Sequence, residues 1–180
     1  MASGDYGQPG RTGATMTAYR HVVTASRHGS KAKAGASMSG SDFDRFVELY
    51  HAALDVFVRG NPAAMKELWS RRDDVTLANP LGPPARGWKD AAKIMDRAAS
   101  QLSGGEPNQF ERLSGHAGTE LAYIVEIERT RMKVGGSDEM SPVSLRATTI
   151  FRPEDGLWKV LHRHADPITT PRPIESIIQM

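Results

Sequence analysis

The sequence contains no cysteine among its 180 residues, which excludes a disulfide framework, thiol catalysis and thiolate metal ligands. It also lacks any apolar run approaching the roughly 20 residues that a transmembrane helix needs. No continuous apolar stretch of the kind found in secretory signals occurs near its beginning. These absences predict a cytoplasmic protein with no membrane partner. A chain of this length is expected to form one domain with a sizeable core.

A clustered excess of basic residues is also missing from the predicted domain, although the sequence pI is about 9.0. Residues 1–41 contain five Lys or Arg and one acid, whereas residues 42–180 contain 18 basic and 20 acidic residues. The basic character therefore belongs to the N-terminal segment. Nucleic-acid binding is not expected, because it requires basic residues gathered on a structured face.

The N-terminal segment, residues 1–41, is rich in Gly, Ser, Ala and Thr and has almost no large apolar side chains. Such a segment buries too little surface to offset the entropy of ordering, so we predict a disordered tail. Met38 is a candidate natural start, and a dispensable arm or a transit peptide are alternatives. The domain is predicted over residues 42–167, followed by a C-terminal extension, residues 168–180.

Helical periodicity dominates the first half of the predicted domain, and strand-like alternation dominates the second half. The predicted helices span residues 41–60, a short stretch after Asn61-Pro62, and residues 88–102. The predicted strands are residues 75–78, 108–116, 119–134, 143–152 and 157–165. Helices that precede an antiparallel sheet predict an α+β fold with helices on one sheet face.

The stretch 145–166 is the most informative segment, because two strand-like runs flank the turn Pro153-Glu154-Asp155-Gly156. Asp-Gly tolerates the positive φ angles of a tight hairpin. Strict alternation places Arg146, Thr148 and Ile150 on one face of the first strand. It places another group together on the second strand: Trp158, Val160, His162, His164 and Asp166. Ionisable groups beside large apolar residues predict the wall of a cavity.

Four short segments occur in a characteristic order: Tyr50-His51-Ala52-Ala53-Leu54 before Gly60-Asn61, Asp74-Val75-Thr76-Leu77 before Asn79-Pro80-Leu81-Gly82, Gly87-Trp88, and residues 155–164. Together they resemble the SnoaL-like, nuclear transport factor 2-like superfamily over about residues 42–167. The resemblance implies a cone-shaped, curved, mixed or antiparallel sheet wrapped around three helices. It does not imply one activity, because the superfamily includes ketosteroid isomerase, polyketide cyclases, scytalone-dehydratase-like enzymes, dioxygenase small subunits and kinase association domains.

Asn79 stands where the resemblance places the catalytic aspartate of ketosteroid isomerase, and an amide cannot accept a proton at neutral pH. The acidic oxyanion donor of that isomerase would fall near Thr148 or Thr149, which are not acids. The isomerase mechanism itself is therefore not expected. Asn79 is predicted to contact substrate or, alternatively, to cap the loop before Pro80.

His162, His164 and Asp166 are the predicted catalytic residues, with one imidazole acting as a general base tuned by the carboxylate. Two alternatives remain open. The three residues could ligate a metal, or the histidines could have a structural role at the strand end or at a dimer surface. The resemblance makes the metal the least favoured, since related domains often end in His-x-His without one. We expect neither a metal nor a cofactor.

Arg129 continues an apolar strand face, and Glu126 and Glu128 lie on the opposite face. An arginine on an apolar face needs a partner. Arg129 and Arg146 are therefore predicted to hold a substrate carboxylate or enolate, or to pair with an acid such as Asp166 or Glu128. Further predicted substrate contacts are Thr148, Asn79 and aromatic residues that otherwise pack the core: Tyr50, Trp69 and Trp88. Tyr50 is the best candidate for a polar group inside the cone.

The predicted function is binding of a small hydrophobic organic molecule in an apolar cone pocket. If the protein is an enzyme, the predicted reaction is a cofactor-independent acid–base reaction of isomerase, cyclase or dehydratase type. The alternative is a non-catalytic association domain that assembles through its sheet. A homodimer is expected, because apolar residues occupy both faces of the predicted strands and the helices cover only one of them.

Overall fold

The computed structural model describes residues 40–177, so the predicted N-terminal tail and the proposed start at Met38 lie outside the described residues. Its helices are α2 (Gly40–Phe57), α3 (Ala63–Leu68), α4 (Trp88–Ala99) and the short 3-10 helix η1 (Ile174–Ile177). Its strands are β1 (Thr76–Ala78), β2 (Ala85–Arg86), β3 (Leu102–Ser103), β4 (Gln109–Ala117), β5 (Ala122–Val134), β6 (Ser141–Glu154) and β7 (Leu157–Asp166). Within residues 40–177, no helix combines the length and apolar character needed to span a membrane.

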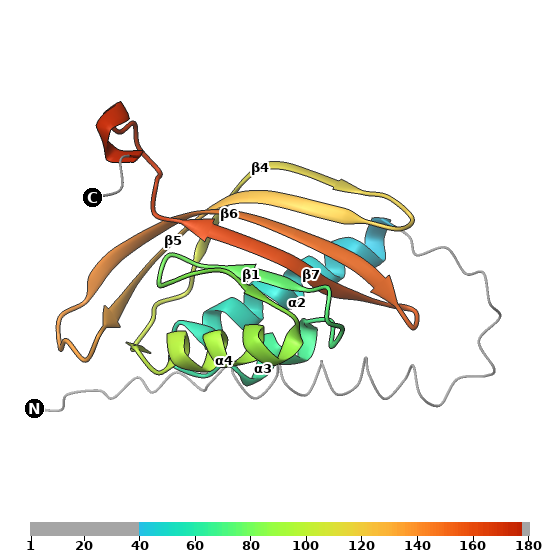
Figure 1. The fold of residues 1–180 in the computed structure, drawn as a ribbon, viewed down its shortest axis with the longest axis horizontal. Helices are drawn as coiled ribbons and strands as arrows, with labels where there is room; N and C mark the ends of the chain where they lie inside the picture. Colours follow the sequence, from blue (N-terminus) through green and yellow to red (C-terminus); the bar gives the residue numbers. More distant parts are fainter. Residues whose placement is uncertain (1–39, 178–180) are drawn as a thin grey trace, which may run out of the picture. The chain divides into compact units, whose positions relative to one another are not determined.

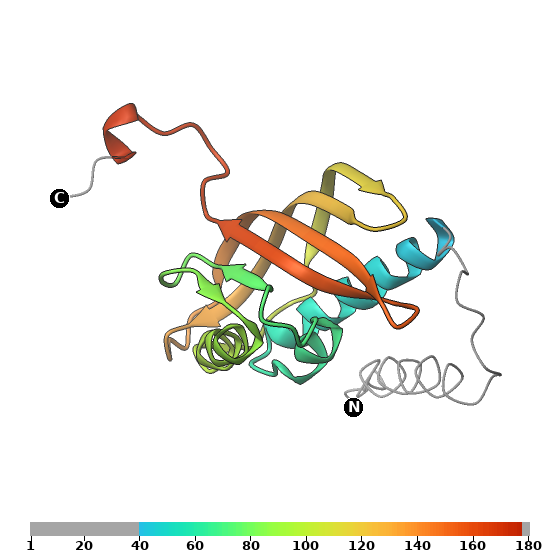
Figure 2. The same cartoon turned by 45° about the vertical axis from the view of Figure 1, so that its right-hand side comes forward.

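The strands form one curved sheet in the order β2-β1-β7-β6-β5-β3, with β4 also paired to β5. Among the named strands of residues 40–177, β1 and β7 pair in parallel and the other pairs are antiparallel. Helices α2, α3 and α4 lie against one side of this sheet, as Figures 1 and 2 show. We call the side that faces the helices the inner face and the opposite side the outer face. The predicted α+β cone with a mixed sheet is confirmed.

Helix α2 packs on the inner face because its apolar residues recur at helical spacing. Phe43, Val47, Tyr50 and Leu54 are all buried, as expected for one side of an amphipathic helix. The ring of Phe43 meets Phe151 of β6 edge-on, with 5.3 Å between ring centroids. Burial of such large aromatic side chains accounts for much of the stability of this core.

The predicted hairpin between β6 and β7 is confirmed. Asp155 and Gly156 both adopt positive φ angles, 52° and 77°, as a tight two-residue hairpin turn requires. Further along this hairpin, however, the pairing is irregular. Phe151 pairs with Val160 and Ile150 pairs with His162, so that Leu161 has no counterpart on β6.

This β-bulge reverses the facing of β7 beyond Leu161, because one extra residue shifts the alternation by one position. Trp158 and Val160 point inward, and Arg163 and Ala165 are the buried residues beyond the bulge. A second group occupies the outer face instead: His162, His164 and Asp166. The prediction that these three share a face with Trp158 and Val160 was therefore wrong.

The facing of β5 also differs from the expectation, because its charged side is the buried one. Ala122, Ile124, Glu126 and Glu128 are all buried on the inner face. The alternate residues point outward, and Tyr123 and Arg129 among them are exposed. The inner carboxylates are tolerated because α2, β4 and β7 supply polar partners for them.

Candidate functional site

Two hydrogen-bonded networks cross the inner face, and each is centred on one of the carboxylates of β5. In the first, Arg163 of β7 donates two hydrogen bonds of 2.7 Å to Glu128. The same guanidinium donates to the hydroxyl of Tyr50, also at 2.7 Å, and this hydroxyl lies 3.1 Å from Oγ1 of Thr149. Tyr50 thus has its polar tip inside the cone, as predicted.

The first network is held away from water. Burial raises the pKa of Tyr50 to about 12, despite the nearby charge of Arg163. Burial alone would lower the pKa of Arg163, but Glu128 and Tyr50 outweigh this effect, so the pKa is raised and the group stays charged. Ala147 and Ala165 occupy adjacent inner positions between Arg163 and Glu128. Their small side chains leave room for the long arginine side chain to cross the sheet.

The second network joins α2, β4 and β5. Glu126 is 1% exposed, and its two oxygens bind different partners. Nε2 of His51 lies 3.0 Å from Oε2, and Nε of Arg112 donates to Oε1 at 2.7 Å. The imidazole of His51 also stacks on Phe110, with 3.6 Å between centroids and 9° between planes. Burial opposes ionisation of Glu126, but His51 and Arg112 more than compensate, so its pKa is lowered.

This arrangement defines the chemistry available to His51. An ionised carboxylate accepts hydrogen bonds but cannot donate them, so Glu126 favours the tautomer of neutral His51 that carries its proton on Nε2. Nδ1 then has a free lone pair, and no described residue hydrogen-bonds to it. The pair has the arrangement of a general base held and oriented by a carboxylate.

The two networks differ in their access to solvent. The side chains of His51 and Arg112 are 21% and 40% exposed, whereas those of Arg163 and Glu128 are 10% and 5% exposed. A small molecule can therefore approach His51 and Arg112 from solvent. Arg163 and Glu128 are much less accessible.

The predicted catalytic residues lie together, but on the outer face. Nδ1 of His162 is 2.7 Å from the hydroxyl of Thr76, and burial, together with His164, lowers the pKa of His162. His164 is more than half exposed and lies 3.9 Å from Asp166. Asp166 instead accepts two hydrogen bonds from Arg146, at 2.9 and 3.2 Å. None of these residues joins the two inner networks.

The predicted substrate contacts are dispersed as well. Arg129 is exposed on the outer face and pairs with Glu111 at 2.7 Å. Thr148 lies on the outer face in register with His164. The side chain of Asn79 accepts a hydrogen bond of 3.0 Å from the backbone N–H of Leu81, which is the capping role considered as the alternative.

The tryptophans considered as pocket or core residues differ in their burial. Trp69 and Trp158 are at most 2% exposed, and neither indole N–H has a hydrogen-bond partner in the described residues. Trp88 lies at the start of α4 beneath the guanidinium of Arg71, 3.9 Å from the ring centroid. Trp69 and Trp158 therefore belong to the core, whereas Trp88 is only partly buried.

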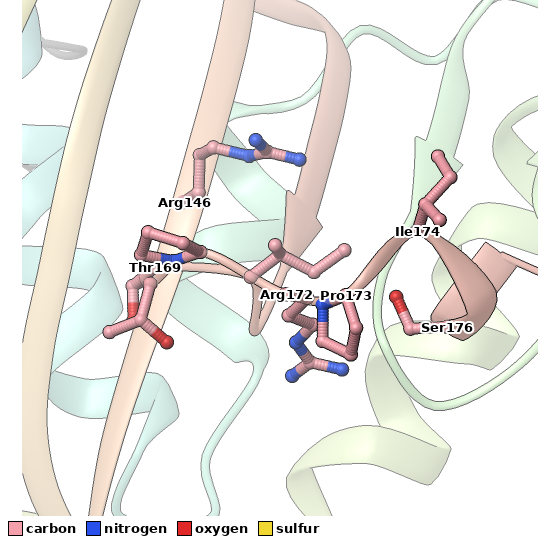
Figure 3. A pocket seen from close by; sticks show the side chains of 9 residues that line it. Arg146, Thr169, Arg172, Pro173, Ile174 and Ser176 are labelled. Atoms are coloured by element: carbon pink, nitrogen blue, oxygen red, sulfur yellow. The ribbon is translucent and has the colours of Figure 1, made fainter.

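A recess of about 450 Å³ lies beside the C-terminal segment that follows β7 (Figure 3). It is lined by Arg146 and by residues of the C-terminal segment: Ile168, Thr169, Thr170, Pro171, Arg172, Pro173, Ile174 and Ser176. The inner networks contribute nothing to its walls. In residues 40–177 there is also no group of three or more His, Asp or Glu side chains placed to hold a metal ion.

Sequence reasoning missed His51, Arg112, Glu126, Glu128 and Arg163 as site residues. One signal was available, since Glu126 and Glu128 alternate with Ala122 and Ile124 on the face opposite the one that carries Arg129. The bulge at Leu161, which turns Arg163 inward, left no comparable sign in the sequence.

The fold is an α+β cone whose inner face carries two polar networks. Residues 46–169 match the model of the SnoaL-like domain family, and the chain belongs to this family. No curated protein sequence matches the chain.

Three solved structures illustrate the likeness in fold. A ketosteroid isomerase-like protein from Erwinia carotovora atroseptica is 14% identical and has a TM-score of 0.60, covering 72% of this chain and 96% of that one. A candidate dehydratase of the NTF2-like family from Streptomyces avermitilis is 18% identical, with a TM-score of 0.56 and the same coverage. A candidate calcium/calmodulin-dependent protein kinase type II association domain from Thiobacillus denitrificans is 20% identical, with a TM-score of 0.54, covering 69% and 93%. At these identities the likeness establishes the fold alone.

Proposed function

We propose that this protein is a cofactor-independent enzyme that moves a proton on a small organic molecule, with His51 as the catalytic base. One observation carries the proposal. A solvent-accessible imidazole is fixed by the buried carboxylate of Glu126, while no residue within 40–177 hydrogen-bonds to its second nitrogen. Relatives of the fold include an isomerase-like protein and a candidate dehydratase, which is consistent with such chemistry.

The proposed step begins with neutral His51. Its Nδ1 lone pair takes a proton from a carbon next to a carbonyl group, and the electrons of the broken C–H bond form an enolate. The negative charge of Glu126 stabilises the resulting imidazolium, and Arg112 lies beside the same carboxylate to stabilise the enolate. Where the enolate is conjugated with a neighbouring carbon–carbon double bond, return of the proton to the far carbon of that system completes an isomerisation. Transfer of the proton to a departing hydroxyl group completes a dehydration and releases water.

Deuterium exchange tests this step without knowledge of the natural substrate. The probe is 2-tetralone in D₂O, whose C1–H bonds are acidified by both the ketone and the ring, and proton NMR follows the loss of the C1 signal. The protein is expected to accelerate exchange, and His51→Gln to reduce this acceleration by about 100-fold or more. His116→Gln, an exposed histidine on β4, is the matched control and is expected to exchange like the original protein.

The same assay decides between the two groups of histidines. Loss of exchange in His162→Gln together with full activity in His51→Gln would move the site to the residues predicted from the sequence, which lie on the outer face. Exchange no faster than in buffer would count against the proposed reaction.

We further propose that the outer face joins two copies in a homodimer, since Tyr123 and Leu121 are both exposed there.

A further inference from the structure

Arg112 has binding capacity that the fold does not use. Its Nε donates to Glu126 at 2.7 Å, and this is its only hydrogen bond to a described residue. The two terminal nitrogens, Nη1 and Nη2, are therefore free to donate, and the side chain is 40% exposed. A guanidinium whose outer edge is free matches a carboxylate through two parallel hydrogen bonds.

The backbone of β4 holds this guanidinium in position. The pairing of β4 with β5 is irregular between Arg112 and Ser114, which leaves Leu113 as an extra residue. Arg112 and Gly115 consequently share the inner face. A side chain at position 115 would approach Nη1 of Arg112, since a Cβ built there lies 3.1 Å from it. The absence of a side chain at Gly115 gives the guanidinium the space it occupies.

The charges of the site favour a negatively charged ligand during the reaction. With His51 neutral, as the proposed reaction requires, the charges of Arg112 and Glu126 balance each other. When His51 accepts a proton, the site gains one positive charge beside the free edge of Arg112. A ligand that brings a negative group to this edge compensates for that charge, and partial burial strengthens the interaction.

We infer that the substrate of this site carries a carboxylate, which Arg112 binds through Nη1 and Nη2 beside His51. The inference rests on the proposed function for the role of His51, but anion recognition can be measured without turnover. Phe110, stacked on His51, offers an apolar surface for the carbon skeleton of the same molecule. Small organic acids with a carbonyl group next to the reacting carbon are therefore the expected class of substrate.

Benzoate and benzamide are a matched pair of probes, because they share a ring and a similar shape but differ in charge. Titrations followed by NMR are expected to show benzoate binding about tenfold tighter than benzamide, the equivalent of ~1.4 kcal/mol, with shifts of the His51 signals. Arg112→Gln is expected to remove the preference, and Arg112→Lys to keep part of it, since lysine retains the charge without the fork. Arg131→Gln, an exposed arginine of β5, is the control and is expected to keep the full preference.

Equal affinity for the two probes would overturn the inference, as would a preference that survives Arg112→Gln or disappears in Arg131→Gln. Melting curves of each variant show whether it is folded, and Arg112→Lys keeps the test open if Arg112→Gln unfolds. If the benzoate preference depends on Arg112 but the protein does not accelerate tetralone exchange, the anion site is supported and the proposed proton transfer is rejected. Exchange that depends on His51, without a benzoate preference, would do the reverse.

Discussion

The inner and outer faces of the sheet each hold an ion pair of the same length in very different surroundings. Arg163 and Glu128 on the inner face are 10% and 5% exposed, whereas Arg129 and Glu111 on the outer face are 46% and 54% exposed. Both pairs are 2.7 Å long. Distance is therefore a poor guide to what an ion pair does for the fold. Water screens the outer charges, but an inner charge that loses its partner has no solvent to replace it.

The largest expected effect comes from breaking the inner pair. Glu128→Ala leaves Arg163 charged and buried, and is expected to lower the free energy of unfolding by about 3–5 kcal/mol. Glu111→Ala removes the matched outer carboxylate and is expected to cost less than about 1 kcal/mol. Denaturant unfolding of both variants measures the contrast, and similar losses would mean that the two faces do not differ as described.

A change of oligomeric state is the next expected effect, because the outer face is proposed to meet a second copy. Tyr123→Arg places a charge among exposed apolar residues of that face and is expected to halve the mass measured by light scattering at micromolar concentration. The control is Arg97→Gln, at an exposed position of α4, and it is expected to leave the mass of the dimer unchanged. A monomer mass for the original protein would show that the outer face stays in contact with water.

Acid is expected to affect the inner face through Glu126. The folded protein lowers the pKa of this carboxyl. The ionised carboxylate therefore contributes to stability above its unfolded-state pKa of roughly 4.3. This contribution is lost as the pH falls through the lower pKa of the folded protein. Glu126→Gln is expected to cost about 1–3 kcal/mol at pH 7, and less near pH 3. Unfolding measured across this range checks the trend; a constant difference between the two proteins would contradict it.

The smallest expected effect concerns His162 on the outer face. Its pKa is lowered in the folded protein, so its contribution to stability is present above the unfolded pKa of about 6.5 and is lost as the pH falls through the folded value. His162→Asn is expected to reduce the slope of melting temperature against pH just below this point. The exposed His164→Asn is the comparison, and an equal change in both variants would show that burial of His162 is not the cause.

The fold could be predicted from the sequence because its signals are local. The spacing of Phe43, Val47 and Tyr50 specifies a helix, and Asp155-Gly156 specifies a tight turn, whatever the rest of the chain does. The family resemblance then supplied the order of the layers. Element boundaries differ from the expectation by a few residues at most strands and helices, as frayed ends usually do.

The site could not be predicted in the same way, because it depends on pairings between distant segments. Glu126 is acceptable inside only because His51 approaches from α2 and Arg112 from β4, 75 and 14 residues away in sequence. Alternation alone favoured the more apolar face of β5 as the buried one. Once polar partners satisfy an inner face, hydrophobicity no longer decides which side of a strand is covered.

The extra residue in β7 bears on how members of this family should be compared. Leu161 lets one strand present Trp158 and Arg163 to the helices although five positions, an odd number, separate them. A relative that lacks this residue would keep the same facing in a regular strand, whereas a strand of unchanged length that ran regularly through Leu161 would direct His162 inward. Structure-based alignment therefore needs a gap at Leu161 before residues on the two sides of the sheet correspond. Loss of the bulge without a change in chain length would exchange the residues that this end of the strand presents to the helices for those on its outer face.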